Sequence, residues 1–206
     1  MRLGDARRLE VPDSSAAAVL LLGPLYHLVE RAERIAALAE ARRVLQPDGL
    51  VLASAISRFG PAMHGLSAHL LDDPVFESIV RRDLADGQHR SRGPDGTLGR
   101  RPYFTTAYLH RPEELAQEVR AAGLEHVATL AIEGPAWLLQ DLDSQWQDPR
   151  RRQTLLWIIR ALEAEPSLLG ATSHLLGIGR RPAPTPPPSV AAASIGGAGV
   201  PEAPLA

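Results

Sequence analysis

Residues 16–56 read AAAVLLLGPLYHLVERAERIAALAEARRVLQPDGLVLASAI, and this stretch decides the fold. It opens on an apolar run at 16–22, which predicts a strand buried on both faces. Apolar side chains then recur at helical spacing over 30–45, and the Gln46–Gly49 turn predicts the end of that helix. A second apolar run at 50–56 predicts another strand. Strand, helix and strand in this order indicate a βαβ unit with parallel strands.

The charged residues of the 30–45 helix are expected mostly on its other faces. They are Arg31, Glu33, Arg34 and Arg42.

The rest of the chain continues the alternation of helices and strands. The patterns predict helices over 73–84, 112–122 and 150–163, strands over 124–132 and 173–179, and an exposed loop over 86–101. The last helix is expected to bury a stripe made of Leu155, Ile158, Ile159 and Leu162. From Arg181 to Ala206 the chain is rich in proline, alanine and glycine and has no periodicity, which predicts a disordered tail. The predicted domain is therefore residues 1–180.

Composition excludes several classes of function. The chain has 206 residues, a net charge of −2 and no cysteine, which excludes disulfides, thiolate zinc sites and cysteine nucleophiles. It also has no lysine, which excludes a P-loop. Scattered histidines without a His-Glu-x-x-His motif predict no metal site. The near-neutral charge predicts no nucleic-acid partner, and the short apolar runs predict no membrane span and no secretion signal. A cytoplasmic protein is therefore expected.

Several segments resemble the class I S-adenosylmethionine-dependent methyltransferases. They are GDARRLEVPDSS at 4–15, GPLYHL at 23–28, RRVLQPDGL at 42–50, HRPEEL at 110–115 and HLLGIG at 174–179. The resemblance covers nearly all of the chain except the tail. It implies an α/β, Rossmann-like methyltransferase sheet that is truncated at its N-terminus, with strands in the order 4-5-7-6 of the family's numbering and flanking helices.

The family's glycine-rich loop has no counterpart in this sequence, so the resemblance is to the C-terminal two-thirds of the family's domain. The loop should precede Gly4, where only Met1–Leu3 stands. The glycines at 177–179 and 196–199 lack the strand–loop–helix context that such a loop needs.

The resemblance implies S-adenosylmethionine as the cofactor and names residues that would hold it. Gly4, Asp5 and Ala6 would lie at the adenine, with Asp5 accepting a hydrogen bond from the exocyclic amine. Leu22 and Gly23 would line the methionine end. The alternative for both segments is an ordinary turn at the end of a strand.

Tyr26 and His27 are the predicted catalytic residues, because the resemblance places them opposite the transferable methyl group. His27 either takes a proton from the acceptor or serves as a cap or packing residue. Four further residues either line a substrate pocket or pack in the core: His89, Tyr103, Phe104 and Tyr108.

The predicted function is methyl transfer from S-adenosylmethionine to a small-molecule acceptor. Because half of the cofactor's cradle has no counterpart, we expect weak or no cofactor binding by this chain. Two explanations stay open: an inactive fragment, or a misassigned start. The alternative is a non-enzymatic binding or assembly module that a partner chain completes. Without a neighbour for the strand at 16–22, its open apolar edge predicts self-association.

Overall fold

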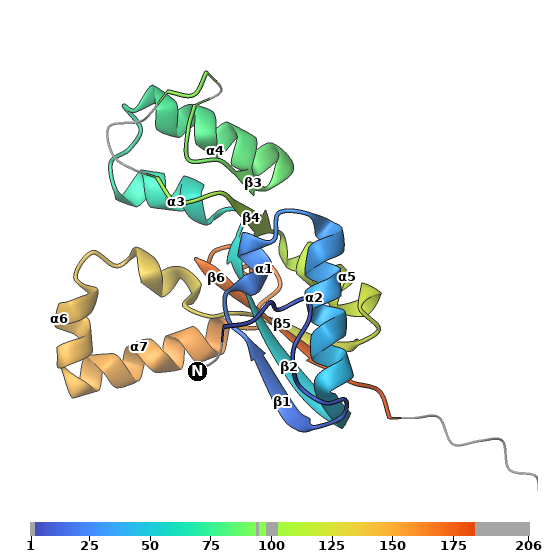
Figure 1. The fold of residues 1–206 in the computed structure, drawn as a ribbon. Coiled ribbons are helices and arrows are strands. Elements are labelled where there is room, and N and C mark those ends of the chain that lie inside the picture. Colours follow the sequence, from blue (N-terminus) through green and yellow to red (C-terminus); the bar gives the residue numbers. More distant parts are fainter. Residues whose placement is uncertain (1–2, 94, 98–102, 184–206) are drawn as a thin grey trace, which may run out of the picture.

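A mixed sheet organises residues 3–93, 95–97 and 103–183, which are the part of the chain that the computed structural model describes (Figure 1). Its strands are β1 (Ala16–Leu21), β2 (Leu45–Ser57), β3 (Gln88–His89), β4 (Ala107–His110), β5 (Glu125–Ala131) and β6 (His174–Arg180). Most of the tail predicted to be disordered, residues 184–206, lies outside the described residues.

The strand order confirms the predicted sheet. β1 pairs with β2 in parallel, β2 pairs with β6 in antiparallel, and β6 pairs with β5 in antiparallel. This is the expected 4-5-7-6 order. β4 pairs in parallel with the last residues of β2, Ile56 and Ser57, and β3 pairs with β4. β2 runs past the carboxyl end of β1, and β4 pairs with the part of β2 that lies beyond it.

The helices lie in three groups (Figure 1). α2 (Arg31–Val44) and α5 (Pro112–Ala121) contact each other and cover one face of the sheet. α3 (Gly60–Ser67) and α4 (Pro74–Asp86) form, with β3, a cap beyond the carboxyl end of β2. The 3-10 helix η1 (Gly134–Leu138), α6 (Leu142–Gln147) and α7 (Pro149–Leu162) form an arm on the other side. The short helix α1 (Pro24–His27) follows β1. No helix in these described ranges is long and apolar enough to cross a membrane.

Two burial predictions are wrong. β1 pairs with β2 alone among the described strands, which agrees with the predicted open edge, but its two faces are not both buried, since Leu20 is 65% exposed. In α7 only Leu155 of the predicted stripe is buried, while Ile158 is exposed and Trp157 is 68% exposed. The physical reason is that α7 belongs to the arm and does not pack along the sheet (Figure 1).

The core lies between the sheet and the pair α2–α5. It includes Ala37, Leu38 and Ala41 of α2 and Leu115 and Val119 of α5, all fully buried. The glycines of β6 belong to this packing. A Cβ at Gly177 would lie 3.0 Å from Leu115 Cγ, and one at Gly179 would lie 2.9 Å from Val119 Cγ1. These glycines therefore let α5 approach the strand, and they form no cofactor loop.

Gly87 makes the turn from α4 into β3. Its φ is +74°, and a Cβ there would lie 2.7 Å from the backbone oxygen of Leu109 and against the guanidinium of Arg58. We expect Gly87→Ala to lower the free energy of unfolding by about 2–3 kcal/mol, because it adds a steric clash to the cost of a left-handed backbone.

Gly96→Ala is the matched control for the Gly87 variant. Gly96 also has a positive φ, +84°, but nothing lies within 4 Å of the added Cβ, so roughly 1 kcal/mol is expected. Urea denaturation measures both variants. Equal losses would show that the close contacts at Gly87 do not matter.

Candidate functional site

The predicted residues that follow β1 lie together at the carboxyl edge of the sheet. Gly23 stands at the N-cap of α1 with φ +140°, and a Cβ there would lie 3.4 Å from the hydroxyl oxygen of Tyr26. The rings of Tyr26 and His27 are 4.7 Å apart between centroids. Leu22 and His27 are exposed, whereas Leu25 anchors α1 in the core. In open α/β sheets this edge is where ligands bind.

The segment Gly4–Ala6 lies near the start of α2, because Ala6 packs against the core cluster and the next residue, Arg7, forms an ion pair with Glu33. The carboxylate of Asp5 is exposed and accepts hydrogen bonds from Arg7, at 2.9 Å from the backbone nitrogen and 2.7 Å from Nη2. These bonds lower the pKa of Asp5 to about 2. Asp5 is therefore ionised at neutral pH, and any adenine amine would share its carboxylate with Arg7.

A buried ion pair joins α2 to α5. Arg34 is 1% exposed, and its Nη2 and Nε lie 2.7 and 3.0 Å from the two carboxylate oxygens of Glu118. Its Nη1 donates to the backbone oxygens of Leu28 and Val29 at 3.0 and 2.6 Å. The expectation that Arg34 lies on another face of its helix is wrong. Because Leu28 and Val29 follow α1, this pair fixes the position of Tyr26 and His27.

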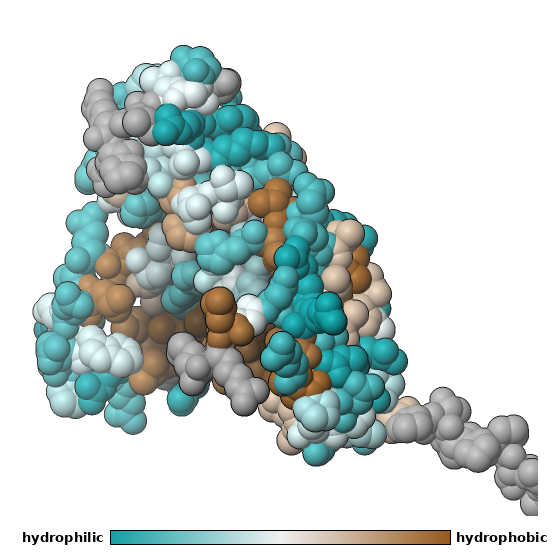
Figure 2. Space-filling view, viewed as in Figure 1, coloured by the Kyte–Doolittle hydropathy of each residue, from teal (hydrophilic) through white to brown (hydrophobic). Residues whose placement is uncertain are grey.

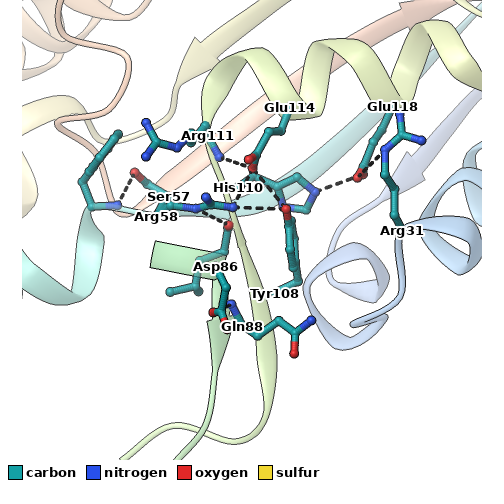
Figure 3. Close-up of polar contacts among 12 residues, drawn as sticks. Arg31, Ser57, Arg58, Asp86, Gln88, Tyr108, His110, Arg111, Glu114 and Glu118 are labelled. Carbon is teal, nitrogen blue, oxygen red and sulfur yellow. Dashed lines mark hydrogen bonds and ion pairs between the residues drawn. The ribbon is translucent and has the colours of Figure 1, made fainter. Parts of the chain in front are cut away.

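His110 of β4 is the third member of this buried group, and it contacts Glu118 (Figure 3). Its Nε2 lies 3.1 Å from Oε2 of Glu118. Burial lowers the pKa of His110, so the neutral ring donates its Nε2 proton to the carboxylate. Burial alone would raise the pKa of Glu118, but hydrogen bonds from His110 and Arg34 outweigh it and the pKa is lowered. Glu118 is therefore a charged, fully paired carboxylate in the interior.

A second ion pair, between Arg58 and Glu114, lies beside the group around Glu118 (Figure 3). Arg58 follows β2, is buried, and places Nη2 at 2.8 Å from the carboxylate of Glu114 and 3.1 Å from the hydroxyl of Tyr108. Glu114 also accepts from the backbone nitrogen of Arg111, at the start of α5. The guanidinium of Arg34 lies 3.5 Å from the centroid of the Tyr108 ring. Tyr108 therefore links the two groups.

An aromatic cavity of about 360 Å³ lies between the cap and the sheet edge. Ile56 of β2 and Ser173 just before β6 form its floor, and Phe104 and Trp137 are among its walls. The Phe104 ring centroid lies 6.3 Å from that of His27 and 6.3 Å from that of His89. Phe104 therefore connects the residues that follow β1 with the cavity.

The geometry agrees with comparisons to known proteins. Residues 1–53 match the family model for a methyltransferase domain. The fold is similar to that of a SAM-dependent methyltransferase from Methanosarcina mazei, with 13% identity and a TM-score of 0.52 over 89% of this chain and 67% of that one. The resemblance to the class I methyltransferases is confirmed. The similar structure from Methanosarcina mazei is described as SAM-dependent, which agrees with the cofactor expected from that resemblance.

Two further methyltransferase structures are similar to this chain. A possible histamine N-methyltransferase from Thermotoga maritima has 15% identity and a TM-score of 0.44, over 86% of this chain and 61% of that one. The CcbJ methyltransferase from Streptomyces caelestis has 16% identity and a TM-score of 0.47, over 86% of this chain and 66% of that one. The chain thus spans 61–67% of the length of these three methyltransferase structures. No curated protein matches the chain.

Sequence reasoning missed the two buried charged groups. A signal for Arg34 was present, because Arg34 shares its helical spacing with Ala37, Leu38 and Ala41, which are all buried. His110 and Glu118 come from separate elements, and nothing in the local pattern indicates that they meet Arg34.

Proposed function

We propose that the protein transfers a methyl group from S-adenosylmethionine to a small-molecule acceptor at the carboxyl edge of β1 and β2. The observation that carries the proposal is the arrangement around Phe104. On one side of this ring lies His27, among the residues expected at the methyl group, and on the other side lies the open aromatic cavity of about 360 Å³. A small apolar acceptor in that cavity would lie next to the cofactor's expected position.

The residues at this edge suit the cofactor. Asp5 is ionised and accessible, so it can accept from the adenine amine even while it binds Arg7. Gly23 has a φ of +140° and carries no side chain, so the backbone after β1 can turn toward the methionine end, with the hydroxyl of Tyr26 beside it. Leu22 offers an exposed apolar side chain beside it. When bound, the cofactor supplies an activated methyl group, so the chain's task is to align the acceptor and exclude water.

In this proposal Tyr26 and His27 contact the acceptor. Their adjacent rings stand between the residues assigned to the cofactor and Phe104. The buried Arg34 holds the loop after α1, so the two rings are presented from a fixed backbone. Titration of the full chain with S-adenosylmethionine, with substitutions at Asp5, tests the proposal and is argued in the Discussion.

We also propose that the edge of β1 self-associates. Among the described strands β1 pairs with β2 alone, and Leu20 and Leu22 are exposed along it. Figure 2 shows hydrophobic surface gathered in a hollow on the side where β1 and α7 lie. Unpaired backbone groups next to apolar side chains favour strand addition. We expect Leu20→Lys to raise the concentration needed for association by about tenfold or more, because a lysine on an edge strand opposes pairing.

Light scattering across a concentration series measures this association. Leu142→Lys is the matched control, because Leu142 is an exposed leucine on α6, away from β1. A monomeric wild-type chain at high concentration would contradict the prediction. Co-purification of a stoichiometric partner that covers β1 would instead favour the alternative of an assembly module.

A further inference from the structure

A buried histidine and a buried carboxylate face each other in the cap. Nδ1 of His89 lies 2.8 Å from Oδ2 of Asp83. Asp83 is fully buried and His89 is 5% exposed. When Nδ1–H of the neutral ring is donated to the carboxylate, Nε2 of His89 carries the lone pair.

Two atoms of this pair are left without partners in the described part of the chain. They are Oδ1 of Asp83 and Nε2 of His89, both buried. A buried carboxylate and a buried, unpaired ring nitrogen both cost stability, and an apolar pair of similar size would pack at lower cost. The pair therefore calls for an explanation other than stability, and a ligand for Nε2 supplies one.

The backbone around the pair is well fixed. Asp83 lies in the last turn of α4, and the backbone nitrogen of Gly87 donates to its carbonyl oxygen at 2.9 Å. Gly87 then turns the chain into β3, where His89 pairs with Ala107 of β4. The nitrogen of Leu109 donates to the oxygen of Gly87 at 2.7 Å. A ring held in this way keeps its direction when a ligand enters.

His89 lines the aromatic cavity of about 360 Å³ and an adjoining one of about 240 Å³. Phe104 and His64 line both cavities as well. The rings of His64 and Trp137 stack at 6.5 Å with an interplanar angle of 25°. Flat, largely apolar walls around the buried, unpaired Nε2 of His89 suit a planar ring that carries a hydrogen-bond donor, and the unpaired Nε1 of Trp137 in the larger cavity offers that ring a donor of its own.

We propose that His89 and Asp83 form a dyad that binds an aromatic hydroxyl compound and removes its proton. The O–H bond of the phenol breaks, the proton forms a bond to Nε2 of His89, and the electron pair stays on oxygen. Asp83 acts as the positioning residue, since its carboxylate holds the ring and offsets the charge of the imidazolium. A phenol ionises nearer to neutral pH than an aliphatic alcohol does, so imidazole takes its proton at lower cost.

This inference deepens the proposed function and rests on it for the fate of the phenolate. The rings of His89 and His27 each lie 6.3 Å from the ring of Phe104, so Phe104 separates the dyad from the residues expected at the methyl group, and the phenolate would reach past this ring. The dyad thereby gives the acceptor's chemical class, an aromatic hydroxyl.

The test uses the full chain and the probe 4-nitrophenol, whose phenolate has its own absorption band. In buffer just below the probe's pKa, we expect added protein to raise the phenolate band saturably. His89→Gln should weaken binding of the probe by about tenfold and abolish the rise, because one charge-assisted hydrogen bond is lost. Asp83→Asn should reduce the rise while the cavity is kept. Binding of 4-nitroanisole, which has no proton to give, should be the same in all three proteins.

His69→Gln is the matched control, an exposed histidine of the cap that does not line either cavity. The inference is overturned if the wild-type chain leaves the phenolate band unchanged, or if folded His89→Gln and Asp83→Asn raise it as the wild type does. Phe104→Ala should weaken binding of both probes. This variant tests the role of the aromatic lining apart from proton transfer to His89. Neither probe needs S-adenosylmethionine, so failure here and failure of cofactor binding are seen separately.

Discussion

Glu118→Ala is expected to lower the free energy of unfolding by about 3–5 kcal/mol, because it leaves the guanidinium of Arg34 buried without its counter-charge. Arg34 and Glu118 are each about 1% exposed, so water cannot replace the lost partner. The same substitution removes the acceptor for Nε2 of His110. Urea denaturation at neutral pH measures the loss.

The pH dependence of stability gives a second readout of the same pair. The folded-state pKa of Glu118 lies below its ordinary value of 4.5, so its contribution is present above that value and is lost as pH falls through the folded pKa. The folded-state pKa of His110 is also lowered, so acid favours the unfolded, protonated form below its ordinary 6.5. The contribution of these two groups to wild-type stability should therefore fall as pH drops below about 6.5, and Glu118→Ala should remove the part of that fall that Glu118 causes.

Glu113→Ala is the control for this prediction. Glu113 is an exposed glutamate on the same helix, and only a small change is expected. Equal effects of the two substitutions at neutral pH would show that the buried pair does not hold α2, α5 and β4 together.

Asp5→Ala is expected to weaken binding of S-adenosylmethionine by about tenfold, since it removes a charged acceptor for the adenine amine. Asp5→Asn keeps an acceptor oxygen and should retain most of the affinity. We expect the wild-type chain itself to bind weakly, because Asp5 and Leu22 are exposed and this edge covers little of a ligand. The pKa of Asp5 is about 2, so binding should not vary with pH near neutrality through this group.

Calorimetry or a ligand-shift titration measures these affinities, and Glu10→Ala is the control. Glu10 is an exposed acidic residue on the same N-terminal segment. Its substitution shows whether loss of one negative charge alone changes the affinity for S-adenosylmethionine. A micromolar dissociation constant for the wild type would contradict the expected weak binding. Unchanged affinity in Asp5→Ala would remove Asp5 from the site.

Elements with strong local signals were predictable. Pro112 at the start of α5 and Gly123 after its end bracket a helix of regular apolar spacing, and the structure has that helix over Pro112–Ala121. The strand order followed from the resemblance. The exposure of Leu20 in β1 was not predictable from composition, because an apolar run does not show whether both faces of the strand are covered. α7 has a helical pattern, but that pattern does not show that the helix lies in an arm.

The site was predictable only in part. Sequence placed Gly23, Tyr26 and His27 in one segment, and the structure keeps them together at the sheet edge. It named His89 and Phe104 as residues of a pocket or of the core, but gave no sign that Asp83, six positions earlier, meets His89. That contact depends on the turn at Gly87, which reverses the chain over the end of α4.

The most direct test of the account is a map of where S-adenosylmethionine binds, obtained from amide NMR shifts of the full, isotope-labelled chain during titration. We predict shifts centred on residues 4–6 and 22–28, with smaller ones at Phe104, and their loss in Asp5→Ala. Shifts that centre elsewhere on the molecule, or none at all at saturating cofactor, would contradict the placement of methyl transfer at the carboxyl edge of β1.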